Sequence, residues 1–98
     1  MLKVREIAME KTYHPDVKKV DLPKIDPRNK AMIKKAIEER LLQQPEIYGK
    51  PLRRTLKGYW KLRVGDYRIV FKITKHKIFI LGIIHRKDVY PQVDQRSL

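Results

Sequence analysis

The 98-residue sequence contains no cysteine, and its three histidines, His14, His76 and His85, lie far apart in the chain. The lack of cysteine excludes disulfide scaffolds, thiol catalysis and thiolate metal sites, and the isolated histidines have no spacing typical of a metal site. A chain of this length forms one domain with a single modest core, which leaves no room for a separate cofactor domain. We therefore expect no metal and no cofactor.

Long apolar runs are also lacking. A membrane-spanning helix needs about 20 consecutive apolar residues, and the first residues, MLKVREIAMEK, are too charged for the apolar part of a secretory signal. We therefore expect a cytoplasmic protein without a membrane-spanning segment. Hydrophobic residues make up 42% of the chain, which is enough for it to fold by itself.

Acidic residues are scarce in one half of the chain. The whole sequence carries 24 Lys+Arg against 11 Asp+Glu, a net charge of +13. Residues 1–49 contain 11 basic and 8 acidic side chains, whereas residues 50–90 contain 12 and 2. Such asymmetry is typical of a protein that binds a polyanion, nucleic acid first and an acidic protein or membrane surface second. A basic surface that only aids solubility is the alternative interpretation.

The residue pattern predicts helices in the first half. Residues 2–9 alternate loosely like an edge strand, and residues 14–22 predict a short helix that ends at Pro23. A second helix is the clearest element, because Asp26 is a good N-cap, Pro27 suits the first helical position and Pro45 marks the end. Its core-facing stripe contains Met32, Ile33, Ala36, Ile37 and Leu41.

The second half predicts a sheet. A basic connection leads into strands at residues 59–64, 67–74 and 77–84, and residues 91–98 are expected to form a frayed C-terminal tail. The prediction is an α+β protein with a single domain at residues 1–90, in which two N-terminal helices pack on an antiparallel β-sheet.

A two-residue loop at Gly65-Asp66 determines how the first two strands pair, because glycine can adopt the positive φ that such a loop requires. The register places Arg63 opposite Arg68, and paired residues share a face of the sheet. One face is expected to pack on the helices and carries Trp60, Leu62, Val64, Tyr67, Ile69 and Phe71. The other face holds the cations and carries Tyr59, Lys61, Arg63, Arg68, Val70 and Lys72.

The crowded cations indicate a function. Two arginines directly opposite cost about 0.2 to 1 kcal/mol, and bound phosphate would relieve that repulsion. RNA supplies its own nucleophile, the 2′-hydroxyl, so strand cleavage requires a proton acceptor, stabilisation of the phosphorane and a proton donor for the leaving oxygen. Like charge lowers the pKa of a lysine among arginines and favours a general base. Lys61 is the candidate acceptor, Arg63 or Arg68 the candidate stabiliser, and the candidate donors are His85, Arg86 and Tyr90.

The stretch GKPLRRTLKGYWKLRVGDYRIVFKI, followed by IIHRKDVY, resembles the RelE/ParE superfamily of toxin–antitoxin toxins, most closely its RelE branch. The resemblance implies two helices on a curved antiparallel sheet. It also implies a ribosome-dependent endonuclease, an mRNA interferase, that inhibits translation by cutting mRNA in the A site through a 2′,3′-cyclic phosphate. The implied partners are a cognate antitoxin, the ribosome and mRNA, with operator DNA bound only through the antitoxin complex.

The resemblance also implies site residues. Lys61 matches the general base, Arg68 the arginine that stabilises the phosphate, Arg86 the proton donor and Tyr90 the tyrosine that positions the nucleotide. We expect further RNA contacts from the neighbouring basic and aromatic side chains of Arg53, Arg54, Lys57, Tyr59, Arg63, Lys72 and His85.

Strict alternation along FILGIIH conflicts with one of these roles, because it places His85 rather than Arg86 on the basic face. Arg86 reaches that face only if the chain bends or bulges. Three alternatives stay open: a ParE-like inhibitor of DNA gyrase, a non-catalytic module that binds nucleic acid or the ribosome, and an inert relative that keeps only the fold.

Overall fold

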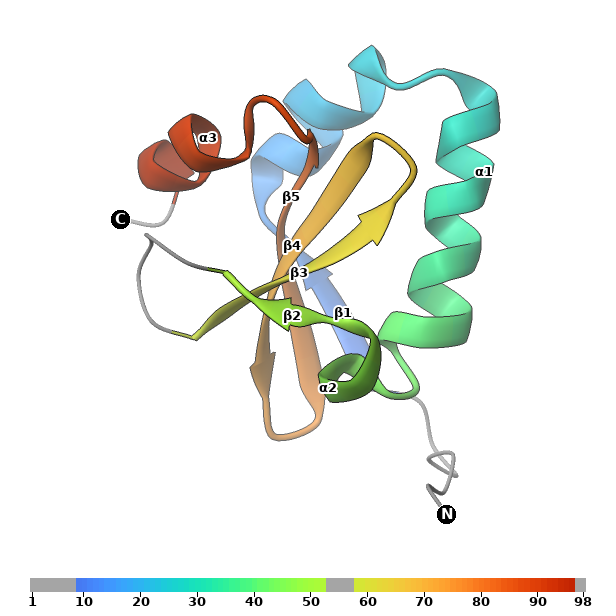
Figure 1. Cartoon of the computed structure of the whole chain (residues 1–98), viewed down its shortest axis with the longest axis vertical. Coiled ribbons are helices and arrows are strands. Elements are labelled where there is room, and N and C mark those ends of the chain that lie inside the picture. Colours follow the sequence, from blue (N-terminus) through green and yellow to red (C-terminus); the bar gives the residue numbers. More distant parts are fainter. Residues whose placement is uncertain (1–8, 53–57, 97–98) are drawn as a thin grey trace.

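The computed structural model describes residues 9–52 and 58–96. A five-stranded sheet forms the centre, with strand order β1-β5-β4-β3-β2 and helical segments on both of its sides (Figure 1). The strands are β1 Glu10–Tyr13, β2 Lys50–Pro51, β3 Tyr59–Val64, β4 Tyr67–Thr74 and β5 Lys77–His85. The predicted α+β class is confirmed, but the sheet is mixed, because β1 pairs with β5 in parallel while the other pairs are antiparallel.

The helical segments of the first half follow the predicted pattern with two corrections. They are η1 Val17–Asp21, η2 Leu22–Lys24, α1 Pro27–Ala36, η3 Ile37–Leu41 and α2 Pro45–Tyr48. Pro23 lies inside η2 instead of ending the first helix, and Pro45 begins α2 instead of ending α1. The edge strand is β1 at residues 10–13, whereas residues 2–8 of the predicted strand lie outside the described ranges.

The start of α1 is as predicted. Pro27 is its first residue, and the Asp26 side chain caps the helix by accepting a hydrogen bond of 2.8 Å from the Asn29 backbone N–H. Ile33, Ala36, Ile37 and Leu41 are buried against the sheet. Met32, however, is 44% exposed, so it does not belong to the core-facing stripe.

The hairpin of β3 and β4 has the predicted register throughout, with Arg63 opposite Arg68 and Trp60 opposite Phe71. Gly65 in the loop adopts φ of 58°, a left-handed conformation that glycine tolerates well. The face predicted to be apolar packs beneath α1 and η1 into an apolar cluster that we call the first core. Its buried members include Val17, Ile33, Ile37, Leu41, Leu62, Ile69, Phe71 and Ile80. Turn chemistry and alternation were therefore sufficient to predict this part of the sheet.

Strand β5 contains a bulge that strict alternation does not predict. Val70 of β4 pairs with Gly82, whereas the next residue, Phe71, pairs with Ile80, so Leu81 is the extra residue in β5. A bulge reverses the inward and outward alternation of everything that follows it. Ile84 is consequently on the face of Arg68, and His85 is on the face of Tyr67.

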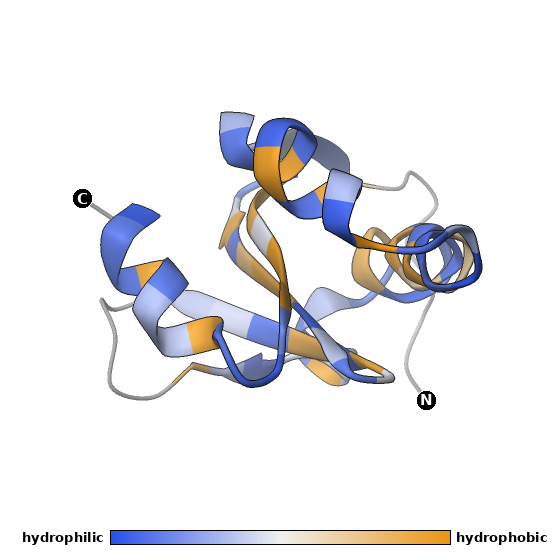
Figure 2. Cartoon of the chain, turned by 90° about the horizontal axis from the view of Figure 1, so that it is seen from above, coloured by the Kyte–Doolittle hydropathy of each residue, from blue (hydrophilic) through white to orange (hydrophobic). Residues whose placement is uncertain are grey.

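The expected frayed tail is wrong for residues 91–96, which belong to the helix α3 Val89–Arg96. Figure 2 shows α3 on one side of the molecule, across the sheet from α1. Val93 is fully buried, and α3 covers a second apolar cluster on the cation-bearing face of the sheet. This second core contains Leu52, Val70, Leu81, Ile84, Val89 and Val93. Residues 97–98 lie outside the described ranges.

Candidate functional site

Cations from three neighbouring strands gather on the part of the sheet that α3 leaves uncovered. Lys61, Arg63 and Arg68 share one face of the β3–β4 hairpin, and β2 adds Lys50 directly opposite Lys61. These side chains line a shallow hollow of about 250 Å³ together with Tyr48. With Arg86, described below, we call them the basic cluster: Lys50, Lys61, Arg63, Arg68 and Arg86.

Arg68 occupies the centre of the electrostatic crowding. Its Nη1 donates hydrogen bonds of 3.0 Å to the Gly65 carbonyl oxygen and 2.9 Å to the Tyr67 carbonyl oxygen, which tie the guanidinium to the hairpin loop. Partial burial lowers the pKa of Arg68 from its usual value, and the neighbouring charges of Arg63 and Arg86 lower it further. The arginine remains cationic at neutral pH, but its charge is held at an energetic cost that a bound anion would offset.

The bulge in β5 brings Arg86 to the basic cluster. Ile84 shares the face of Arg68, and Arg86 follows in the turn after β5, close enough for its charge to act on Arg68. The Arg86 backbone N–H donates a 2.8 Å hydrogen bond to the Asp66 carbonyl oxygen, and its Nε lies 3.8 Å from Asp66 Oδ1. The sequence analysis required a bend or bulge for Arg86 to reach the basic face, and the structure has a bulge in β5.

His85 lies on the opposite face, so its expected place on the basic face is wrong. It pairs with Tyr67, and the two rings meet edge to face with centroids 5.7 Å apart. His85 Nδ1 accepts a 3.3 Å hydrogen bond from the Lys87 backbone N–H. The extra residue of the bulge explains why His85 is not on the basic face, since it shifts the alternation of the residues that follow it by one position.

Aromatic side chains flank the cluster. Tyr90 projects from α3, is half-buried and packs against the second core, on the same side of the sheet as Arg68. Tyr59 also packs against the second core, and the Lys72 ammonium lies 5.9 Å from the centroid of its ring. The remaining predicted RNA contacts lie outside the described residues: Arg53, Arg54 and Lys57.

Sequence reasoning missed two members of the site. Lys50 was not predicted as a site residue, because its alignment with Lys61 depends on the two-residue strand β2. Asp66 was assigned only a turn role, yet its carboxylate is the counter-charge that raises the pKa of Arg68 against the effects of burial and the two arginines. Its position in the loop between two arginine-bearing strands was the signal that could have indicated this role.

The arrangement suits phosphate chemistry by side chains. Several cations converge on an exposed hollow beside an aromatic ring, which is a geometry that can bind a phosphodiester and stabilise added negative charge. Within residues 9–52 and 58–96, no group of three or more His, Asp, Glu or Cys side chains is placed to hold a metal ion. No helix in the part of the chain that the structure describes is long and apolar enough to cross a membrane.

A second hollow of about 310 Å³ has a different character. It lies between η1, α1 and the sheet, its walls are mainly apolar, and four lysines stand at it. The lysines are Lys11, Lys18, Lys30 and Lys34. This hollow does not include the basic cluster, so it is not the candidate catalytic surface.

Comparison with known proteins found similar sequences. A family model described as ParE toxin of type II toxin-antitoxin system, parDE, matches residues 13–90. Toxin RelG of Mycobacterium tuberculosis is 38% identical over 72 residues, which make up 71% of this chain and 83% of RelG. Toxin RelE of the same organism is 42% identical over 52 residues, 51% of this chain and about half, 54%, of that relative.

A solved structure extends the similarity to three dimensions. A chain in the crystal structure of the RelBE2 toxin–antitoxin complex from Mycobacterium tuberculosis superimposes with a TM-score of 0.73 and 30% sequence identity. The superposition covers 82% of the present chain and all of that chain, 100%. The residues that the family model matches, 13–90, include β2, β3, β4 and β5, the strands around which the basic cluster lies.

Proposed function

Since the chain belongs to the family of ParE toxins of type II toxin–antitoxin systems, we propose that it is a toxin of the RelE type that cleaves mRNA on the ribosome. The observation that carries this proposal is the basic cluster: Lys61 and Arg68 line one exposed hollow, and Arg86 lies close enough for its charge to lower the pKa of Arg68. Repulsion between these cations does not stabilise the fold. A phosphodiester bound there would relieve it.

The proposed reaction is cleavage by the RNA's own 2′-hydroxyl. Lys61 accepts the proton of this hydroxyl as its oxygen attacks the adjacent phosphorus, and Arg68 stabilises the phosphorane. Arg86 donates the proton that the leaving 5′-oxygen requires, and Tyr90 stacks on or positions the nucleotide. The P–O5′ bond breaks as the P–O2′ bond forms, which leaves a 2′,3′-cyclic phosphate and a free 5′-hydroxyl.

The proposed partners follow from the same surface. The ribosome would present mRNA in its vacant A site, and a cognate antitoxin would neutralise the toxin; the matched solved structure is itself a toxin–antitoxin complex. We propose an acidic, amphipathic antitoxin segment, since it would complement the net charge of +13. Operator DNA would be bound only through the toxin–antitoxin complex, in the cytoplasm.

The test is mRNA cleavage on programmed ribosomes with an occupied P site and a vacant A site. Wild type is compared with Arg68→Ala and with Lys77→Ala, which removes an exposed strand cation outside the basic cluster. We expect cuts in the A-site codon that end in a 2′,3′-cyclic phosphate. Arg68→Ala should lower kcat by about 10²- to 10³-fold, because a preorganised charge at the phosphorane is lost, whereas Lys77→Ala should cleave like wild type.

Absence of cleavage by folded wild-type protein would overturn the proposal. Gyrase supercoiling would then be assayed with the same three proteins, since inhibition there would identify a gyrase poison of the same fold. A protein that binds ribosomes but leaves both mRNA and gyrase intact would be a non-catalytic binding module.

A further inference from the structure

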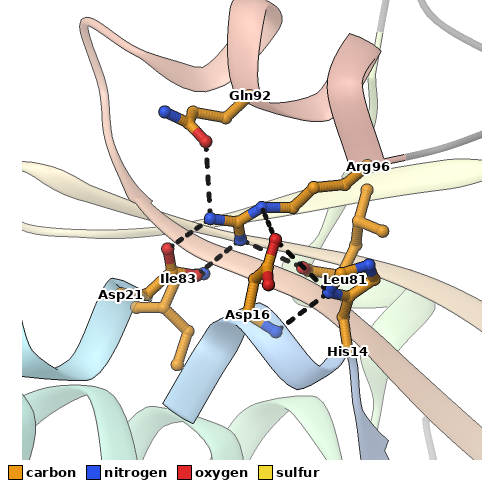
Figure 3. A network of polar contacts seen from close by, with 7 residues as sticks. All are labelled: His14, Asp16, Asp21, Leu81, Ile83, Gln92 and Arg96. Carbon is orange, nitrogen blue, oxygen red and sulfur yellow. Dashed lines mark hydrogen bonds and ion pairs between the residues drawn. The ribbon is translucent and has the colours of Figure 1, made fainter. Parts of the chain in front are cut away.

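A buried ion pair joins the N-terminal helical segments to the C-terminal end of α3. The Arg96 guanidinium and the Asp21 carboxylate form two parallel contacts, each 2.7 Å long (Figure 3). Their side chains are only 4% and 6% exposed. This two-pronged geometry is directional, so it determines where the end of α3 lies relative to η1.

The same pair also binds the backbone of the β5 bulge. Asp21 Oδ2 accepts a 2.9 Å hydrogen bond from the Ile83 backbone N–H, and Arg96 Nη1 donates a 3.3 Å hydrogen bond to the Leu81 carbonyl oxygen. Between these two residues, Gly82 leaves space that the guanidinium and the Ile84 side chain share, because a Cβ there would lie 2.8 Å from Arg96 Nη1 and 2.6 Å from Ile84 Cδ1. The ion pair and the bulge are therefore one structural unit.

The position of this unit connects it to the site. The chain between Ile83 and Arg96 is held at both of its ends by the single Asp21–Arg96 pair. Within that segment lie two of the residues proposed to act on RNA, Arg86 and Tyr90. The bulge sets the face of the residues that lead to Arg86, and the placement of α3 sets the position of Tyr90.

Stability alone is a weak reason for such a pair. Removing two charges from water is costly, and well-packed apolar side chains at buried ion pairs are often as stabilising or more so. Here the surroundings are already partly apolar, since Val93 and Leu81 of the second core are buried nearby in α3 and β5. Additional polar groups complete the network: Asp16 Oδ2 lies 3.6 Å from Arg96 Nε, and Gln92 Oε1 accepts a 3.4 Å hydrogen bond from Nη2.

We propose that Asp21 and Arg96 are positioning residues for RNA cleavage, which hold the bulge and α3 so that Arg86 and Tyr90 meet the phosphate bound at Arg68. This inference rests on the proposed function. It assigns a role to two residues that do not touch the substrate, and it predicts that their loss affects the chemical step more than the binding of the ribosome.

The test separates positioning from folding by a double substitution. Asp21→Leu combined with Arg96→Met replaces the pair by apolar side chains that can keep the fold without its directional contacts. We expect kcat for cleavage on programmed ribosomes to fall by about 10- to 100-fold, as for small displacements of reacting groups, while KM changes by less than about threefold. Arg96→Lys keeps the positive charge but cannot form the two parallel contacts with the carboxylate. Its kcat should lie between those of wild type and the double variant.

The control for lost stability is Leu41→Ala, which opens a cavity in the first core, away from the pair. Its kcat should stay within about threefold of wild type at a temperature where the protein is folded. A wild-type kcat in the double variant, or an equal loss of kcat in Leu41→Ala, would overturn the positioning role.

Amide hydrogen exchange distinguishes this inference from the proposed function. The Arg86 backbone N–H, bonded to the Asp66 carbonyl oxygen, should exchange faster in the double variant by at least about tenfold, whereas amides in α1 should not change. If wild type cleaves no RNA, the proposed function fails and the catalytic part of this inference fails with it. Unchanged exchange at Arg86 would instead show that the pair does not hold the segment.

Discussion

At the scale of single residues, the site is a compromise between repulsion and binding. Arg63 and Arg68 face each other directly, and the charge of Arg63 contributes to the lowered pKa of Arg68. Arg63 is exposed, and it lines the hollow together with Lys61. We therefore propose that Arg63 serves the binding of an anion in the hollow and not folding.

Arg63→Thr tests this compromise. Threonine suits a strand, and removal of the facing charge should raise the free energy of unfolding by about 0.2 to 1 kcal/mol. The affinity of the same variant for a short RNA, measured by fluorescence anisotropy, should be lower than that of wild type. Lys77→Thr is the matched control, since Lys77 is an exposed strand cation opposite Thr74. Equal stabilisation by both substitutions would mean that the arginine pair exerts no specific strain.

Asp66 limits how strongly the basic cluster attracts anions. Its carboxylate lies 3.8 Å from Arg86 Nε and raises the pKa of Arg68. Asp66→Asn should therefore tighten RNA binding by about two- to fivefold at low salt, the range of an exposed charge pair. Asp94→Asn removes an exposed acid on α3 and serves as control in the same titration. Weaker binding by Asp66→Asn would indicate that the carboxylate organises the arginines instead of competing with phosphate.

At the scale of elements, local rules predicted the hairpin and failed at the bulge. The Gly65-Asp66 loop and the period-two alternation act over neighbouring residues, so they determine the β3–β4 register without help from the rest of the chain. The side chains that bind the backbone of the bulge, Asp21 and Arg96, come from distant parts of the sequence. Gly82 within a strand was the available signal for a bulge, but nothing local indicated which side chain fills the space beside it.

Helix α3 was missed for a related reason. An eight-residue helix is not stable by itself, so its formation depends on the apolar surface on which it packs. The signals were present as Asp88 before the helix and the spacing of Val89 and Val93. The almost continuous apolar run of β5 also indicates a strand covered on both faces. Without a second layer over β5, that run would be exposed to water.

Val93→Ala measures how firmly α3 belongs to the fold. Val93 is fully buried in the second core, and the loss of its methyl groups should lower the free energy of unfolding by about 1 to 3 kcal/mol. Urea unfolding should show a lower midpoint with an unchanged slope. Gln95→Ala, at an exposed position on the same helix, should change stability by less than about 0.5 kcal/mol. A midpoint unaffected by Val93→Ala would mean that α3 is detached in solution.

At the scale of the whole molecule, two helical layers leave only part of the sheet available to a ligand. The first core occupies one face, and α3 covers much of the other. The exposed remainder carries the basic cluster, so a partner that approaches the sheet meets cations from β2, β3, β4 and the turn after β5. Net charge by itself does not create this surface, because lysines also surround the apolar hollow beside α1.

The placement of charge, and not its amount, should determine both binding and cleavage. Two triple variants lose the same charge: Lys61→Gln, Arg63→Gln and Arg68→Gln at the site, and Lys18→Gln, Lys30→Gln and Lys34→Gln at the apolar hollow. Each phosphate contact with single-stranded RNA contributes about 0.7 to the slope of log affinity against log salt. The site variant should therefore lose about 2 from that slope and lose cleavage. The variant at the apolar hollow should lose less than about 0.7 from the slope and should still cleave mRNA. Equal losses of slope would mean that RNA is held by the overall charge, and the basic cluster would no longer be the RNA interface.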